Sequence, residues 1–135
     1  MAGEASQAGA HIMLDAMTGR SSAAIPTNVY LALCTSAPTD TALGTEVTTP
    51  ATNGYDREAV TWTAPSAGST ENTALITFGP FTSDLGNVTH CMLMPATTGG
   101  TATDMLAWWT LDAARDPANG DSLTVAAGAL VMTRD

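Results

Sequence analysis

The alternation of apolar and polar positions divides the chain into one helical segment and a following series of short strands. In residues 3–20, four apolar side chains recur at positions i, i+3, i+4 and i+7, which places them on one helix face. These residues are Ala10, Met13, Leu14 and Met17. Gly19 follows them and suits a left-handed helix C-cap. We therefore expect an N-terminal helix or arm over residues 3–20, whose apolar stripe packs either on the same domain or on a neighbouring subunit.

After Pro26 the apolar residues occur in short runs separated by Gly, Pro, Asn and Ser, which is the pattern of strands and turns. Seven runs are predicted to be strands: 29–34, 57–62, 72–78, 87–95, 105–111, 123–126 and 129–133. The connections between them leave little room for crossover helices, so we expect no parallel sheet. The pattern predicts a mainly β fold: an antiparallel β-sandwich or small barrel of about six to eight short strands with one N-terminal α-helix.

The length of the chain is that of one domain. Its 135 residues are enough to bury one core without disulfides, so we assign residues 1–135 to a single β-rich domain. Residues 39–53 are rich in Thr, Ala, Gly and Pro and show no periodicity. We expect a long loop there, of a length that in compact domains is usually functional or mobile.

The charge of the chain excludes two classes of partner. The formal net charge is −9, and the sequence contains no lysine. The basic residues are dispersed: Arg20, Arg57, Arg115 and Arg134. Nucleic-acid binding requires clustered basic side chains, and anionic membranes repel an acidic surface, so we expect neither partner. The N-terminus carries an acid before any base and lacks the pattern of a secretion signal, so we expect synthesis and folding in a cytoplasm.

The residues that could carry catalysis are few. The two histidines are His11, on the polar side of the predicted helix, and His90, within a predicted strand. Cys91 follows His90, but adjacent strand residues point to opposite faces, so this pair cannot act together. Cys34 and Cys91 are best interpreted as buried free thiols, although a disulfide stays open. The sequence contains no nucleotide-binding or hydrolase motif, so we expect no catalytic residue and no enzyme.

Three further features bear on ligands. Asp116, Asn119 and Asp121 could hold Ca²⁺ in a turn, but ordinary turn capping by these side chains is the favoured interpretation, and we expect no metal or cofactor. Trp108 and Trp109 are adjacent in a strand, so one should face the core and the other should face outward. The outward tryptophan is the best candidate for an interface anchor, with a carbohydrate platform as the alternative. The candidate interface residues are Met13, Leu14, Met17, Trp108 and Trp109.

The order of several sequence blocks resembles a known family. The blocks are 29–40 (VYLALCTSAPTD), 45–47 (TEV), 53–62 (NGYDREAVTW), 85–90 (LGNVTH) and 119–130 (NGDSLTVAAGAL). In this order they resemble small structural proteins of tailed bacteriophages, which are labelled tail-fibre-like or head-decoration (cement) proteins. The resemblance extends from about Gly19 to Val131, and the chain departs from it at residues 90–94 and 99–104.

The resemblance implies a function on a virus particle. It implies a β-sandwich-like domain that forms a homotrimer on the outer capsid surface, is made in the cytoplasm of the bacterial host, and has no catalytic motif. We therefore predict a head-decoration protein that stabilises the shell by bridging major capsid protein subunits. A tail or tail-fibre component of the virion is the alternative, and a carbohydrate-binding module is a third interpretation.

The predicted helix and the loop at 39–53 are the segments that could reach a neighbouring subunit. If the helix is the anchor, deletion of residues 1–19 should abolish binding of the chain to the particle, measured as occupancy on purified virions. Unchanged occupancy would exclude the helix as the anchor.

Overall fold

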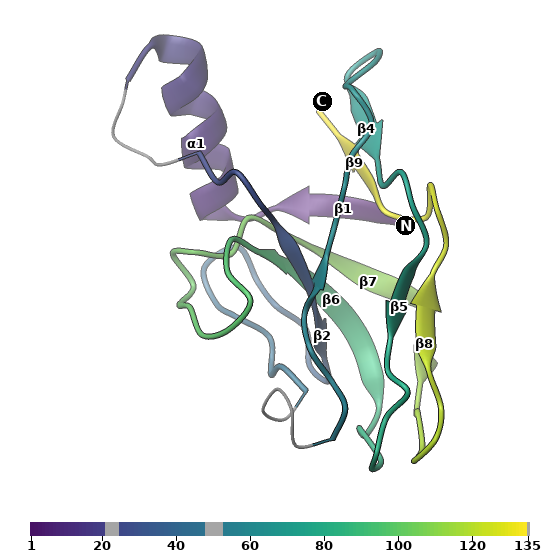
Figure 1. Cartoon of the computed structure of the whole chain (residues 1–135). Helices are drawn as coiled ribbons and strands as arrows, with labels where there is room; N and C mark the ends of the chain where they lie inside the picture. Colours follow the sequence, from purple (N-terminus) through teal and green to yellow (C-terminus); the bar gives the residue numbers. More distant parts are fainter. Residues whose placement is uncertain (21–24, 48–52, 135) are drawn as a thin grey trace.

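Nine strands and one helix make up the described part of the chain (Figure 1). The computed structural model describes residues 1–20, 25–47 and 53–134. The elements are β1 (Ala2–Ala5), α1 (Gln7–Thr18), β2 (Tyr30–Cys34), β3 (Glu58–Ala59), β4 (Ser69–Glu71), β5 (Ile76–Phe78), β6 (Val88–Met94), β7 (Ala107–Arg115), β8 (Leu123–Val125) and β9 (Val131–Thr133). The predicted mainly β fold with an N-terminal helix is confirmed. No helix among the described residues is long and apolar enough to span a bilayer.

The strands form two sheets. The large sheet has the order β3-β2-β6-β7-β1-β9-β4, and β5 pairs with β8 in a small second sheet. Figure 1 shows the large sheet curling, with β5 and β8 beside it. All the pairings between these strands are antiparallel except that of β1 with β9, which is parallel. The sheet is therefore antiparallel as expected, with one parallel pair, β1 with β9, that the sequence pattern did not predict.

The N-terminal segment differs from the helix expected over residues 3–20. Residues Ala2–Ala5 form β1, and Ser6 begins the helix as its N-cap by accepting a 3.1 Å hydrogen bond from the backbone N–H of Gly9. The predicted C-cap is confirmed, because Gly19 has a φ of 72°. Since β1 lies inside the sheet, deletion of residues 1–19 would remove an internal strand and would not test the helix alone.

All seven predicted strands are present, but their lengths differ from the prediction. Only Glu58–Ala59 of the run 57–62 is a strand, whereas β7 continues past residue 111 to Arg115. Besides β1, the sequence pattern missed β4, whose three residues, Ser-Thr-Glu, have no apolar side chain to bury. The strand forms because it pairs with β9 at the edge of the large sheet.

The core has two parts, one on each face of the central strands β2 and β6. On one face, Leu31, Leu33 and Trp109 pack with side chains of β5 and β8 in the larger cluster. On the other face lies a smaller cluster: Ala32, Cys34, Met92, Met94 and Met105, with Leu43 and Trp108 packed against it. Because both faces are covered, β2 carries the continuous apolar run seen in the sequence instead of an alternating one.

The described part of the predicted loop at 39–53 packs against the sheet. Thr39 and Ala42 form a backbone bridge, and Leu43 covers the smaller cluster. Val47 donates a 2.9 Å backbone hydrogen bond to Leu33 in β2. Residues 48–52 of this prediction lie outside the described residues. The segment 39–47 is therefore packed on the sheet and helps to cover the core.

The contact between α1 and the sheet depends on Gly9. A Cβ added at Gly9 would lie 2.1 Å from the backbone carbonyl oxygen of Leu106. Replacing a helix glycine with alanine normally stabilises by about 1 kcal/mol. Here we expect Gly9→Ala to lower the free energy of unfolding by about 1–3 kcal/mol, measured by urea denaturation, because backbone atoms must move apart. A variant as stable as the parent would contradict this contact.

Candidate functional site

The apolar stripe of α1 is exposed. Met13, Leu14 and Met17 have exposed fractions of 46%, 57% and 68%. Gly9 is the one buried residue of the helix, and Figure 1 shows α1 standing away from the sheet beyond its first turn. The stripe therefore does not pack on the same domain. Of the two packing partners that the sequence left open for the helix, the first is wrong. Packing on a neighbouring subunit stays a prediction.

An apolar groove lies beside the stripe. It has a volume of about 670 Å³ and lies between α1 and the paired strands β4 and β9. Its apolar lining is Met13, Trp62, Pro65, Leu93 and Met132, with Ala5 at the end of β1. Arg134 is the one charged residue that lines it. We refer to the stripe of Met13, Leu14 and Met17 together with this groove as the α1 surface.

The adjacent tryptophans point to opposite faces, as predicted. Trp109 is fully buried, stacks on Trp62 with 6.0 Å between ring centroids, and donates from Nε1 to the carbonyl of Val131 at 3.1 Å. It is a core residue and has no surface to offer a partner. Trp108 is half-buried against the smaller cluster, and its buried Nε1 has no hydrogen-bond partner among the described residues.

A carbohydrate platform would need an exposed aromatic ring. Trp62 and Trp108 are half-buried, and Trp109 is buried. None of the three is fully exposed, and a carbohydrate platform stays a prediction.

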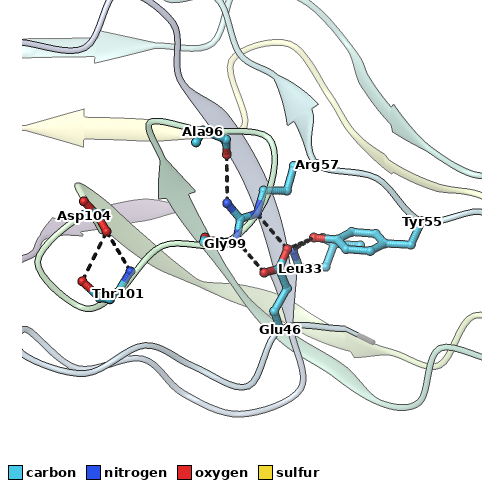
Figure 2. Close-up of polar contacts among 8 residues, drawn as sticks. All are labelled: Leu33, Glu46, Tyr55, Arg57, Ala96, Gly99, Thr101 and Asp104. Carbon is cyan, nitrogen blue, oxygen red and sulfur yellow. Dashed lines mark hydrogen bonds and ion pairs between the residues drawn. The ribbon is translucent and has the colours of Figure 1, made fainter. Parts of the chain in front are cut away.

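A buried arginine joins three segments of the chain. Figure 2 shows the guanidinium of Arg57 between the carboxylate of Glu46 and the loop that follows β6. Arg57 donates from Nε and Nη2 to the two carboxylate oxygens of Glu46, at 2.8 and 2.6 Å. It also donates to the backbone carbonyls of Ala96 and Gly99, both at 2.8 Å. The arginine thereby fixes the segment around Glu46 against residues 95–100.

Tyr55 extends this network into the core. Its hydroxyl donates to Glu46 at 2.8 Å and accepts from the backbone N–H of Leu33 at 3.0 Å. Burial, followed by the negative charge of Glu46, raises the pKa of Tyr55, whereas the hydrogen bond with Glu46 raises the pKa of Arg57. The tyrosine is therefore neutral and the arginine charged. All the polar atoms of this network are used in holding loops together.

The sequence did not reveal this network, because its members are too far apart along the chain. Glu46 and Arg57 are 11 residues apart, and no periodicity connects them. One feature of the sequence could have indicated the network: Arg57, one of four basic residues, lies beside an apolar strand. An arginine in such a place is rarely buried without a carboxylate partner.

The fold brings one cysteine to the same face as His90. Cys34 and His90 are cross-strand partners in β2 and β6. Burial, followed by the charge of Glu46, raises the pKa of the Cys34 thiol to about 12, and burial lowers the pKa of His90. The thiol is therefore protonated at neutral pH. The imidazole Nδ1 is hydrogen-bonded to the hydroxyl of Thr89 at 2.7 Å. The pair lacks the activated thiolate that nucleophilic catalysis requires.

The predicted free thiols are confirmed. Cys34 and Cys91 are both free and buried. They belong to the two different clusters, on opposite faces of the large sheet. A disulfide between them is therefore not formed.

Two acidic side chains hold the turn around residues 118–121. Asp121 accepts a 3.0 Å hydrogen bond from the backbone N–H of Ala118, and Asp84 accepts one of 3.1 Å from the N–H of Asn119. Among the described residues, no group of three or more His, Cys, Asp or Glu side chains could hold a metal ion. This geometry is that of turn capping.

Comparison with known families gives a match over nearly the whole chain. The model of the family described as "Podophage GP4 fiber I protein gp80" (Gp80) matches residues 4–133. No curated protein matches the chain. The matched range contains α1 and every strand that follows it.

The buried pair of Arg57 and Glu46 yields a stability prediction. Glu46→Gln keeps the shape of the side chain but leaves the buried guanidinium without its counter-charge. We expect the free energy of unfolding to fall by about 2–3 kcal/mol in urea denaturation, somewhat less than for a fully buried pair because the Glu46 side chain is 23% exposed. The same change at the exposed Glu4 should cost less than about 0.5 kcal/mol. Equal effects at the two sites would contradict the role of Arg57.

The raised pKa values of the buried thiols and of Tyr55 yield a pH prediction. These groups stay protonated in the folded chain at pH values where the unfolded chain releases their protons. Above about pH 8.5 the unfolded state then binds fewer protons, so the free energy of unfolding decreases as the pH rises. Urea denaturation under reducing conditions at about pH 7 and pH 10 measures this decrease. Cys91→Ala should make it smaller, and a decrease of the same size in that variant would contradict the assignment.

Proposed function

Because the chain belongs to the Gp80 family, described as podophage GP4 fiber I protein gp80, we propose that it is a structural subunit of a fibre on a bacteriophage particle. The family is one of phage structural proteins, which places its members in the virion. The match over residues 4–133 is the observation that carries the proposal.

The family description favours one of the two virion locations that the sequence left open. It names a fibre, which agrees with the tail-fibre alternative. Head decoration, the bridging of major capsid protein subunits and a place on the capsid surface receive no support from that description. We therefore prefer the fibre, with its neighbours in the fibre as the protein's partners.

The described side chains suit a protein that works by binding. The buried polar groups of Arg57, Glu46 and Tyr55 are used to fix loops, and the thiol nearest a histidine is kept protonated by burial. The apolar side chains of α1 are instead left on the outside. A rigid β body with an exposed apolar face is what a subunit of an assembly requires.

Labelling of intact particles tests the proposal. Gold-conjugated antibodies raised against the purified chain should label the fibres in electron micrographs. Particles grown from a phage with an early stop codon in this gene should lose both the label and the corresponding fibre density. Label on the head shell, with the fibres unlabelled, would overturn the proposal and restore the head-decoration prediction.

A further inference from the structure

We propose that the space between β7 and β8 receives an extended, basic segment of a different virion protein, which pairs with the open edges of both strands. This inference rests on the proposed function, because the partner would be a neighbour in the fibre. Its binding test uses the isolated chain, so the outcome does not depend on where the protein lies in the particle.

Two consecutive strands leave their facing edges open. Strands that follow each other in a chain usually pair, but β8 pairs with β5, and β7 pairs with β6 and β1. On the β1 side, the register covers Ala107 and Trp108, whereas β7 continues to Arg115. Among the described residues, no hydrogen-bonded pairing joins β7 to β8. Such edges present backbone N–H and C=O groups that another strand can pair with.

The position of β1 shows which kind of segment fits beside β7. β1 is antiparallel to β7 and parallel to β9. β4 and β5 succeed each other along residues 69–78, and their antiparallel partners β9 and β8 therefore run in the same direction. Figure 1 shows β8 beside β7 and below β9, and Met1 lines the hollow between β7 and β8. The open space thus continues the place that β1 takes between β7 and β9.

The space is a continuous groove. Two hollows of about 370 and 150 Å³ lie between β7 and β8, and they share Arg115, Leu123 and Thr124. We refer to them together as the β7–β8 groove. Leu123 and Val125 in its lining are buried, and Leu111 is half-buried. Alternate side chains of an added strand can pack on these apolar groups, while its backbone pairs with the edges.

The charge of the groove selects a basic occupant. Its lining contains three carboxylates and one guanidinium: Asp112, Asp116, Asp121 and Arg115. Lysine or arginine side chains on the incoming strand would complement this excess of negative charge. The chain itself has no lysine and four arginines far apart in the sequence, so a second copy offers no segment of this kind. The partner we expect is a different protein, with apolar and basic residues alternating along the added strand.

The added strand would also join the two sheets. At present β5 and β8 form a separate sheet, although β5 contacts β3 at the far edge of the large sheet. A strand paired with both β8 and β7 would connect β5-β8 to β7-β6-β2-β3 and so close a ring of strands. Binding should therefore raise the melting temperature of the chain.

The first experiment measures binding of a synthetic peptide to the purified full chain. The probe is a fluorescein-labelled peptide in which lysine alternates with valine (KVKVKVK), and fluorescence polarisation should show saturable binding in the micromolar range. The control KVKPKVK keeps the charge, but its central proline lacks the N–H that a strand needs and should bind about tenfold more weakly. Failure of KVKVKVK to bind, or equal binding of the two peptides, would overturn the proposal.

A pair of charge variants locates the site. Asp112→Asn, Asp116→Asn removes two exposed carboxylates from the groove and should weaken KVKVKVK binding about fivefold. The matched control Glu4→Gln, Asp40→Asn makes the same change in net charge at exposed sites outside the groove and should bind like the parent. Circular dichroism checks that both variants are folded. Equal weakening in the two would show attraction by overall charge and would overturn the proposed site.

Hydrogen–deuterium exchange provides an independent readout. Bound KVKVKVK should protect the amides of residues 111–115 and 123–125 and leave those of α1 unchanged. Protection confined to other segments would overturn the proposal. Fibre labelling in the particle together with a chain that binds no peptide would leave the proposed function standing and refute strand addition alone. Peptide binding in the groove together with label on the head shell would do the reverse.

Discussion

The structure depends on the insertion of β1 between β7 and β9. Without this strand the large sheet would divide into two parts, β3-β2-β6-β7 and β9-β4. The insertion is tight, since a Cβ at Gly3 would lie 2.3 Å from the indole ring of Trp109, and the ammonium of Met1 donates to Ala129 at 2.7 Å. It also places α1, because Ser6 and Gln7 donate backbone hydrogen bonds to Leu106 at 3.1 Å and Asp40 at 3.0 Å. The strand that completes the sheet therefore also holds the helix out from it.

What could be read from the sequence was what local patterns determine. The stripe of α1 and its cap at Gly19 follow from helical spacing, and the opposite directions of Trp108 and Trp109 follow from strand alternation. β1 could not be read, because Ala-Gly-Glu-Ala has no β-branched or aromatic residue. It is a strand only because distant residues, 107–108 and 131–132, pair with it. For the same reason, the ion pair of Arg57 with Glu46 became visible only in the fold.

The resemblance seen in the sequence identified a kind of protein more securely than its place in the virion. Its blocks contain residues of the core, such as Leu31, Val60 and Leu123, and the turns between them. Such residues determine the fold, which a head protein and a fibre protein can share. Location and partners depend on the exposed surface. On this chain the net charge is −9, and the helix presents methionine and leucine side chains beside a mainly apolar groove.

The central claim is that α1 is held outward by β1 so that a partner can cover its apolar face. Hydrogen–deuterium exchange over residues 7–18 tests it most directly, by comparing the dilute monomeric chain with the assembled form, either the oligomer or the intact particle. We expect the amides of α1 to exchange rapidly in the monomer and to become protected on assembly, while those of β2 and β6 are protected in both. Strong protection of α1 in the monomer, or rapid exchange in the assembled form, would contradict the claim.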